Sequence, residues 1–242
     1  MNLASYCLLG TAVFAGGFVS GMAGFAFSAV AGAIVLHVFQ PSEAVPLMMA
    51  CSVGVQASTL VSLRNQMRWK ESLLLIAGGL PALPVAVFFL QNTNGQTLRM
   101  AFGALIALYS GYSLFRPALG RFRADDRHSR NFLIGFGGGL IGGLTAMPGA
   151  LPTIWCDING MPKDQQRGLV QPFIAVMQIA ALMLMLSRHE LPKAILFDLA
   201  VCLPPLALGT ALGVLMFRRI NEAAFRRVVL VTLLLSGLAL VI

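Results

Sequence analysis

Charged residues are scarce in this chain of 242 residues. Lys, Arg, Asp and Glu make up 11% of it, against roughly 25% in ordinary soluble domains, while hydrophobic residues make up 57%. The mean hydropathy is correspondingly high, at +0.81. Such a chain needs lipid as its solvent and has room for about eight to ten spans of the roughly 20 residues that a bilayer requires. We therefore predict an all-α polytopic membrane protein without a separate soluble domain.

Motifs for catalysis, metal binding and nucleic-acid binding are also absent. The four cysteines lie in or beside apolar segments without C-x-x-C spacing, so we expect them to be packing residues. Neither G-x-S-x-G, H-E-x-x-H nor a Walker loop occurs. The formal charge of +8 comes from short connectors and not from one basic face. We predict no enzyme activity, no metal, no cofactor and no nucleic-acid partner.

Charge-poor stretches mark the predicted membrane segments. The first half contains 3–22, 24–39, 45–63, 72–90 and 100–115. The second half contains 131–145, 147–155, 169–186, 194–217 and 228–242. The segment 147–155 is too short to cross a bilayer, and the leading pair of each half is rich in glycine. We therefore expect each leading pair to form a broken or re-entrant hairpin buried in protein.

The second half repeats residues of the first after 122 to 126 positions. Gly17 and Gly21 recur as Gly139 and Gly143, Gln56 as Gln178, Pro81 as Pro204, and Ser110-Gly111 as Ser236-Gly237. Duplicated halves are frequent in transporters, whose substrate lies near the bilayer midplane. We predict a first repeat at 1–115, a basic linker at 116–130 and a second repeat at 131–242. The four repeated glycines are expected to let helices approach closely.

The distribution of lysine and arginine predicts the orientation. If each leading pair returns the chain to the side it came from, 14 of the 17 cations lie on one side, and only Arg99, Arg188 and Lys193 on the other. If each leading pair crosses once, the division is 10 against 7. The first arrangement makes the repeats inverted. It places the linker in the cytoplasm and both termini outside it, in an inner or plasma membrane.

Two glycine-rich stretches and two polar connectors stand at equivalent places: 16–24, 135–143, 41–44 and 160–163. With the chain length and the basic linker, they resemble the TauE/SafE family of sulfite and organosulfur-anion exporters. The family usually has a tighter glycine cluster followed by proline after the first span. Here 25–28 reads FAFS, whereas 147–149 keeps MPG. The resemblance implies a secondary transporter exporting sulfite, a sulfonate or a related anion.

Other functions stay open at this point. A passive anion channel, a proton-coupled importer of the same fold and a membrane scaffold are the alternatives to export. The expected partners are a small anionic substrate and the lipid bilayer, and a homodimer is left open.

A helix broken at membrane depth supplies the candidate anion site. Pro148, Gly149 and Pro152 interrupt the second leading pair and free backbone N–H groups, and the positive end of a half-helix attracts anions. The predicted anion contacts are Thr145, Gly149 and Thr153, with Gly24 and Ser28 as their first-half counterparts. The alternative is a kink that only shapes packing.

Gln56 and Gln178 lie near the middle of their segments, where a side-chain amide is costly without a partner. We predict both as anion contacts, with Gln171 as a further candidate. Hydrogen bonding between helices is the alternative. Asp198 and His37 are the candidates for proton coupling. Asp198 lies only about 6 Å from the start of its segment, at 1.5 Å per residue, and is expected to reach the headgroup region.

Overall fold

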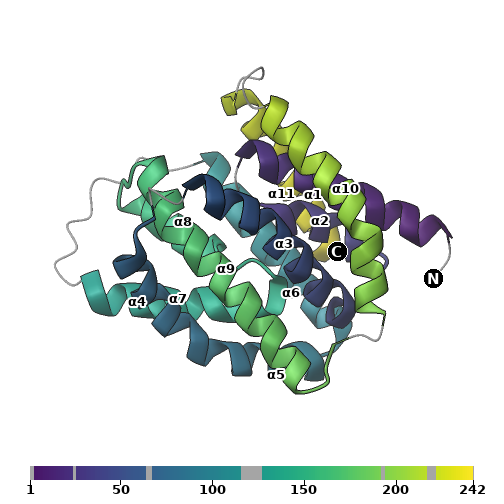
Figure 1. The fold of residues 1–242 in the computed structure, drawn as a ribbon, viewed down its shortest axis with the longest axis horizontal. Coiled ribbons are helices and arrows are strands. Elements are labelled where there is room, and N and C mark those ends of the chain that lie inside the picture. Colours follow the sequence, from purple (N-terminus) through teal and green to yellow (C-terminus); the bar gives the residue numbers. More distant parts are fainter. Residues whose placement is uncertain are drawn as a thin grey trace. The chain divides into compact units, whose positions relative to one another are not determined.

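The structure is a computed structural model that describes residues 3–23, 26–63, 67–115, 127–191, 194–216 and 222–241. Regular structure within these ranges is entirely helical (Figure 1). The helices are α1 (Leu3–Ala23), α2 (Phe27–Val35), α3 (Pro41–Leu63), α4 (Trp69–Gly79), the 3-10 turn η1 (Leu80–Ala82), α5 (Leu83–Asn92), α6 (Gly95–Phe115), α7 (Arg127–Thr145), α8 (Ala150–Ile158), α9 (Lys163–Ser187), α10 (Ile195–Met216) and α11 (Glu222–Val241). The predicted all-α architecture is confirmed.

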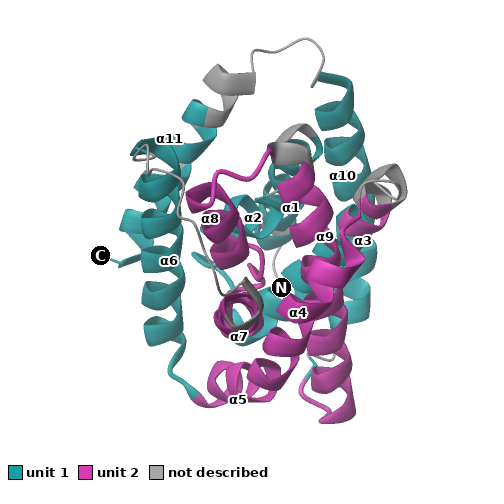
Figure 2. Cartoon of the chain, turned by 90° about the vertical axis from the view of Figure 1, so that its left-hand side faces the viewer, with its two compact units in different colours: residues 1–55, 93–116, 191–242 teal, residues 56–92, 117–190 magenta. Residues whose placement is uncertain are grey.

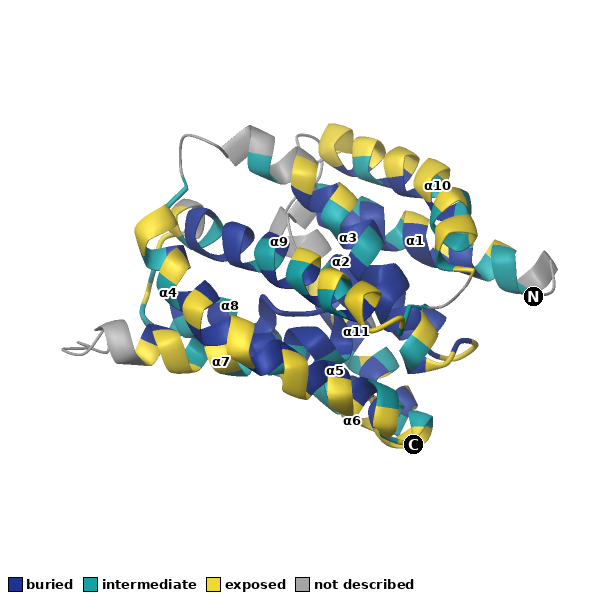
Figure 3. Ribbon diagram, turned by 60° about the horizontal axis from the view of Figure 1, so that its bottom comes forward, coloured by how far each residue is buried: buried dark blue, intermediate teal, exposed yellow. Residues whose placement is uncertain are grey.

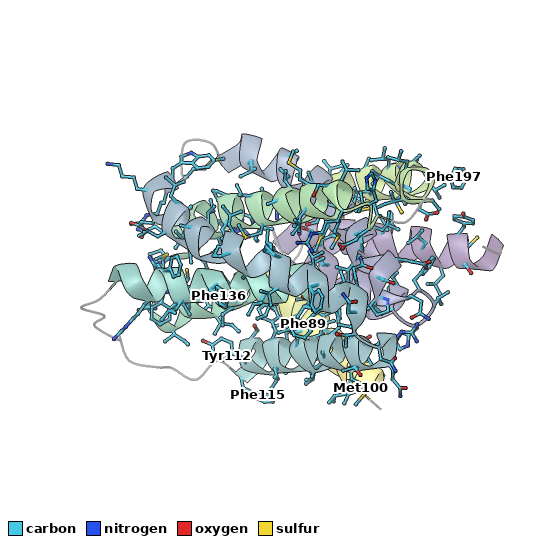
Figure 4. All side chains as sticks on the ribbon, turned by 90° about the horizontal axis from the view of Figure 1, so that it is seen from below. Phe89, Met100, Tyr112, Phe115, Phe136 and Phe197 are labelled. Carbon is cyan, nitrogen blue, oxygen red and sulfur yellow. The ribbon has the colours of Figure 1, made fainter. Side chains whose placement is uncertain are left out.

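Several helices have the length and composition of membrane spans. Four described segments qualify: Trp69–Asn92, Gly95–Phe115, Gln165–Ser187 and Ile195–Met216. Large apolar side chains such as Phe115 and Phe197 extend outward from their helices (Figure 4), with 77% and 62% of their surface exposed. Apolar groups turned outward in this way suit a lipid environment. The full number of eight to ten spans stays a prediction.

The second element of each half is a short helix. Both α2 and α8 have nine residues and therefore rise about 13 Å, less than half of a hydrocarbon core of about 30 Å. Left-handed alanines precede them, Ala26 at φ 73° and Ala146 at φ 57°. The leading pair of each half is thus interrupted, as predicted, although helix α2 is much shorter than the predicted segment 24–39.

The helices form two compact units, coloured separately in Figure 2. Unit 1 comprises residues 1–55, 93–116 and 191–242, and unit 2 comprises 56–92 and 117–190. Each unit therefore takes helices from both halves of the sequence. The predicted repeats are halves of the sequence and do not coincide with these units. Their boundaries stay a prediction. Residues 116–126 of the predicted linker lie outside the described part of the chain.

In unit 1, α1 packs along α10 (Figure 1). A Cβ on Gly17 would lie 3.1 Å from the Leu206 carbonyl oxygen, and one on Gly21 would lie 2.5 Å from that of Thr210. Later residues of α1 thus contact later residues of α10, so the two helices run parallel. The opposite side of α10 is exposed along much of its length (Figure 3). Glycine thus provides the close approach that was predicted.

Unit 1 also contains the pair α6 and α11, each the last helix of its half. Gly103 lies against Gly237, whereas Gly111, farther along α6, lies against Leu234, earlier in α11. Contacts advance in opposite directions, so the two helices are antiparallel.

In unit 2, α7 packs against α4 and α5. A Cβ on Gly139 would collide with the backbone of Gly79, and one on Gly143 would lie 2.5 Å from the Cβ of Ala86. All four repeated glycines thus lie at helix contacts, and their predicted packing role is confirmed. Cys51, Cys156 and Cys202 are buried, Cys7 is exposed, and all are free thiols.

The start of α4 is fastened to α9 by hydrogen bonds. Pro172 lies inside α9 and has no N–H to offer the carbonyl of Gly168, four residues earlier. The backbone N–H of Arg68 donates to that carbonyl instead, at 3.0 Å. One turn on, the Ser72 hydroxyl donates to the Leu169 carbonyl at 2.7 Å. A helix defect in one half is thereby satisfied by the other.

Candidate anion site at the break between α7 and α8

The chain changes direction between α7 and α8 within unit 2. Helix α7 ends at Thr145, and the left-handed Ala146 turns the chain while its N–H still donates to the Gly142 carbonyl at 2.8 Å. Pro148 cannot continue the helical hydrogen bonds, because it lacks an N–H. Helix α8 then begins at Ala150 with Gly149 as its N-cap, and no side chain in the described part of the chain caps it.

Only part of the backbone in this break is hydrogen-bonded. The N–H of Ala150 donates to the Met147 carbonyl at 3.2 Å, and the N–H of Thr153 donates to the Gly149 carbonyl at 2.9 Å. Pro152, like Pro148, has no N–H to place. Among the described residues, none accepts from the N–H groups of Met147, Gly149 or Leu151.

These N–H groups lie at or just before the N-terminus of α8, where Gly149 is the N-cap and Leu151 the second helical residue. Met147 and Gly149 are buried and Leu151 is half-buried. Buried N–H groups without a partner are rare in proteins because each one costs free energy. The aligned peptide dipoles of α8 add positive potential at the same end. The geometry therefore suits an acceptor with negative charge.

Helix α9 packs over the break and holds it. The Gln178 side chain, only 2% exposed, donates from Nε2 to the Ala146 carbonyl at 3.3 Å. Gly149 lies under the same helix, since a Cβ there would meet Cδ1 of Ile174 at 2.5 Å. Gln171 is also buried and lies seven residues before Gln178, hence on the same face of α9.

The predicted second-half residues differ in what they offer. The Thr145 hydroxyl donates to the Ile141 carbonyl at 2.6 Å, so its proton is already committed. Thr153 is half-buried, and its carbonyl accepts from Gln166 Nε2 at 3.0 Å. No described residue bonds to the Thr153 hydroxyl. Thr145, Gly149 and Gln178 thus surround the break, with Thr153 one turn into α8.

Sequence reasoning did not identify Ala146 or Leu151. The signal for Leu151 was available, because Pro148 and Pro152 have no N–H and only residues 149–151 between them can donate from the backbone. Ala146 gives no such signal, since alanine seldom adopts positive φ. The Ala146 carbonyl is nevertheless the hydrogen-bond acceptor that the buried amide of Gln178 needs.

The first-half counterpart lies in unit 1 at the start of α2. Ser28 is buried, and the N–H groups of Phe27, Ser28 and Ala29 have no acceptor among the described residues. The first N–H bond here runs from Val30 to the Ala26 carbonyl, at 3.0 Å. The predicted contact Gly24 lies outside the described part of the chain.

Gln56 is buried in α3 with 8% of its surface exposed, and its Oε1 has no hydrogen-bond partner among the described residues. Gln56 and Gln178 are 122 positions apart, and the same offset makes Gly24 the counterpart of Ala146, the residue that Gln178 contacts. Gln56 as an anion contact stays a prediction.

The two candidates for proton coupling belong to unit 1. Asp198 lies in the first turn of α10, half-buried, and accepts a hydrogen bond at Oδ1 from the Tyr6 hydroxyl at 3.4 Å. His37 is exposed in the turn after α2. Their role in proton coupling stays a prediction.

Comparison with known proteins identifies the family. The family model described as sulfite exporter TauE/SafE matches residues 8–240, nearly the whole chain. No curated protein and no solved structure matches. The matched range contains both short helices, α2 and α8, and the buried glutamines. The chain therefore belongs to the sulfite exporter TauE/SafE family and is a membrane transport protein.

Proposed function

We propose that this protein exports a small sulfur-containing anion, such as sulfite or an organosulfonate, and binds it at the N-terminus of α8. The observation that carries the proposal is the set of N–H groups of Met147, Gly149 and Leu151 without described acceptors. Within a membrane, an unsatisfied N–H costs several kcal/mol. A sulfite or sulfonate group has three oxygens to accept from such donors.

The surroundings of the break make the proposed site an uncharged one. Gln178 donates a hydrogen bond to the Ala146 carbonyl oxygen. This bond reduces the repulsion that the partial negative charge of that oxygen would exert on a nearby anion. The N–H donors and the helix dipole supply attraction without a full positive charge. A site of this kind binds weakly enough for release, as a transporter requires.

The proposed direction is outward, by alternating access. A cytoplasm-negative potential favours exit of an anion by about 2.3 kcal/mol per charge per 100 mV, so export needs no coupling ion. Inverted repeats with extracytoplasmic termini, in an inner or plasma membrane, are part of the proposal. The antiparallel pair α6 and α11 supports inversion, because these helices occupy the same place in the two halves.

The test is flux in proteoliposomes loaded with labelled sulfite, ethanesulfonate or sulfate under an imposed potential. We expect saturable efflux of sulfite or the sulfonate that is faster when the loaded side is negative. Single-channel currents without saturation would replace export by a passive channel. Absence of flux for every anion would overturn the proposal.

A further inference from the structure

Unit 2 contains a second polar feature, a pocket of about 310 Å³ at the C-terminal end of α8. Its polar lining comes from Glu71 in α4, Asn131 in α7, Trp155 and Asn159 at the end of α8, and Gln165 in α9. This volume is at the small end of the range for ligand pockets, about 300–1,000 Å³.

Two amides of the pocket have their acceptor ends occupied by the protein. Asn131, 5% exposed, accepts at Oδ1 from the indole N–H of Trp155 at 3.3 Å. Gln165 accepts at Oε1 from an Arg68 guanidinium nitrogen at 2.9 Å. Asn131 is thereby held in a buried position, whereas Gln165 is exposed at the edge of the pocket. The remaining groups, Asn131 Nδ2 and Gln165 Nε2, are donors with no acceptor among the described residues.

The rest of the lining balances charge and adds apolar surface. Arg68 pairs with Glu71, so the carboxylate of the pocket is neutralised by a neighbouring cation. The Asn159 amide donates to the Trp155 carbonyl at 2.7 Å and stabilises the end of α8. Met161 and Leu169 provide apolar surface beside the donors. The pocket therefore combines oxyanion donors with room for a short hydrocarbon body.

We propose that this pocket is a loading site that binds an organosulfonate before the anion reaches the N-terminus of α8. The inference rests on the proposed function. The two sites lie at opposite ends of α8, about 13 Å apart at 1.5 Å per residue. The pocket is lined by residues 159–162 and by Glu71, which pairs with Arg68. Arg68 is one of the cations of the side predicted to be cytoplasmic, and 159–162 directly precede another, Lys163. Substrate arriving from that side meets this pocket first.

Trp155 reports on occupancy. The chain has two tryptophans, and the other, Trp69, is 50% exposed, so Trp69→Phe leaves Trp155 as the sole tryptophan, which excitation near the red edge of its absorption selects over tyrosine. The purified full-length protein is titrated with sulfite, ethanesulfonate and butanesulfonate. We expect a saturable change in emission, with affinity rising about fourfold for each buried methylene. No saturable response to either sulfonate would overturn the inference.

An isosteric pair of variants tests the donor. Asn131→Asp keeps the oxygen that accepts from Trp155 but replaces the donor by a carboxylate oxygen, and should weaken sulfonate binding at least tenfold. Asn94→Asp is the matched control, because Asn94 is exposed in unit 1 and its Oδ1 accepts from the Gln96 N–H at 3.0 Å. Equal affinity in the Asn131 variant and the control would overturn the assignment.

Flux separates this inference from the proposed function. In proteoliposomes, Asn131→Asp should raise the KM for sulfonate added on the pocket side and leave kcat near that of the control. Sulfonate flux with an unchanged KM would remove the loading role and leave export standing. A Trp155 response without flux of any anion would overturn export, and the loading role with it.

Discussion

Gln178 positions the broken helix. Its amide reaches the Ala146 carbonyl, 32 residues earlier, and holds the left-handed residue that turns the chain. The predicted role was contact with the anion, and the alternative was hydrogen bonding between helices. The structure shows such a bond, made to the backbone of the break itself. Gln178 can therefore act on substrate through the orientation of the α8 N-terminus.

Replacing Gln178 should damage stability and transport together. Gln178→Leu leaves the Ala146 carbonyl buried without its donor, at a cost of about 1–3 kcal/mol. We expect a lower melting temperature in detergent and reduced flux in proteoliposomes. The control is Gln96→Leu, the same change at an exposed position of α6. An unchanged melting temperature and flux would contradict this role.

The two threonines of the break should respond differently. The Thr145 hydroxyl is committed to the Ile141 carbonyl, while no described residue bonds to that of Thr153. Thr153→Val should therefore raise the KM about tenfold, as expected for loss of a hydrogen bond to a charged group. Thr145→Val should change it little. Initial rates of flux against anion concentration measure both, and the reverse order would remove Thr153 from the site.

At the scale of helices, glycine decides where backbones meet. Gly10 and Gly21 both lie in α1, but a Cβ on Gly10 would meet no atom of the described residues within 4 Å, whereas one on Gly21 would lie 2.5 Å from the Thr210 carbonyl oxygen in α10. A backbone atom cannot move aside as a flexible side chain can. Replacing Gly10 by alanine therefore tests helix propensity alone, whereas replacing Gly21 also tests the packing of α1 against α10.

Gly21→Ala should lower the melting temperature because it forces α1 away from α10. Gly10→Ala should leave it unchanged or raise it, since alanine favours a helix interior by about 1 kcal/mol over glycine. Thermal unfolding of both variants in the same detergent measures the difference. Equal melting temperatures would show that the approach of α1 to α10 does not depend on glycine.

The break before α8 could be predicted from the sequence, although proline alone is no sufficient sign, because Pro172 lies inside a continuous α9. Pro148 and Gly149 located the break before α8 to within a few residues. No proline lies in 24–39, and the shortness of α2 depends on a left-handed alanine that composition does not reveal. The contact from Gln178 to Ala146 is tertiary, so the sequence indicated that a partner was needed without naming it.

At the scale of the whole molecule, the two units exchange helices between the sequence halves. Helix α1 packs with α10 in unit 1, and α7 packs with α4 and α5 in unit 2. The duplication predicted corresponding elements, and α2 and α8 do have equal lengths. It did not predict this exchange, because helix pairing is a tertiary property and the repeat of single residues does not say which helices pack together.

Inverted repeats require both termini on the same side of the membrane. In a cysteine-free background, Asn2→Cys and Ile242→Cys should both react with an impermeant maleimide added to intact cells. Arg123→Cys in the basic linker should react only after permeabilisation. Labelling of the two termini from opposite sides would contradict the orientation derived from the charges.

The separation between α1 and its partner has a consequence for biosynthesis. The bond from Tyr6 to Asp198 joins residues 192 positions apart. At a synthesis rate of about 5–20 residues per second, α1 therefore waits roughly 10–40 s before its partner leaves the ribosome. During that interval its glycine face is without the α10 backbone against which it packs. A chain truncated before α10 should thus be degraded faster by membrane proteases than the full chain.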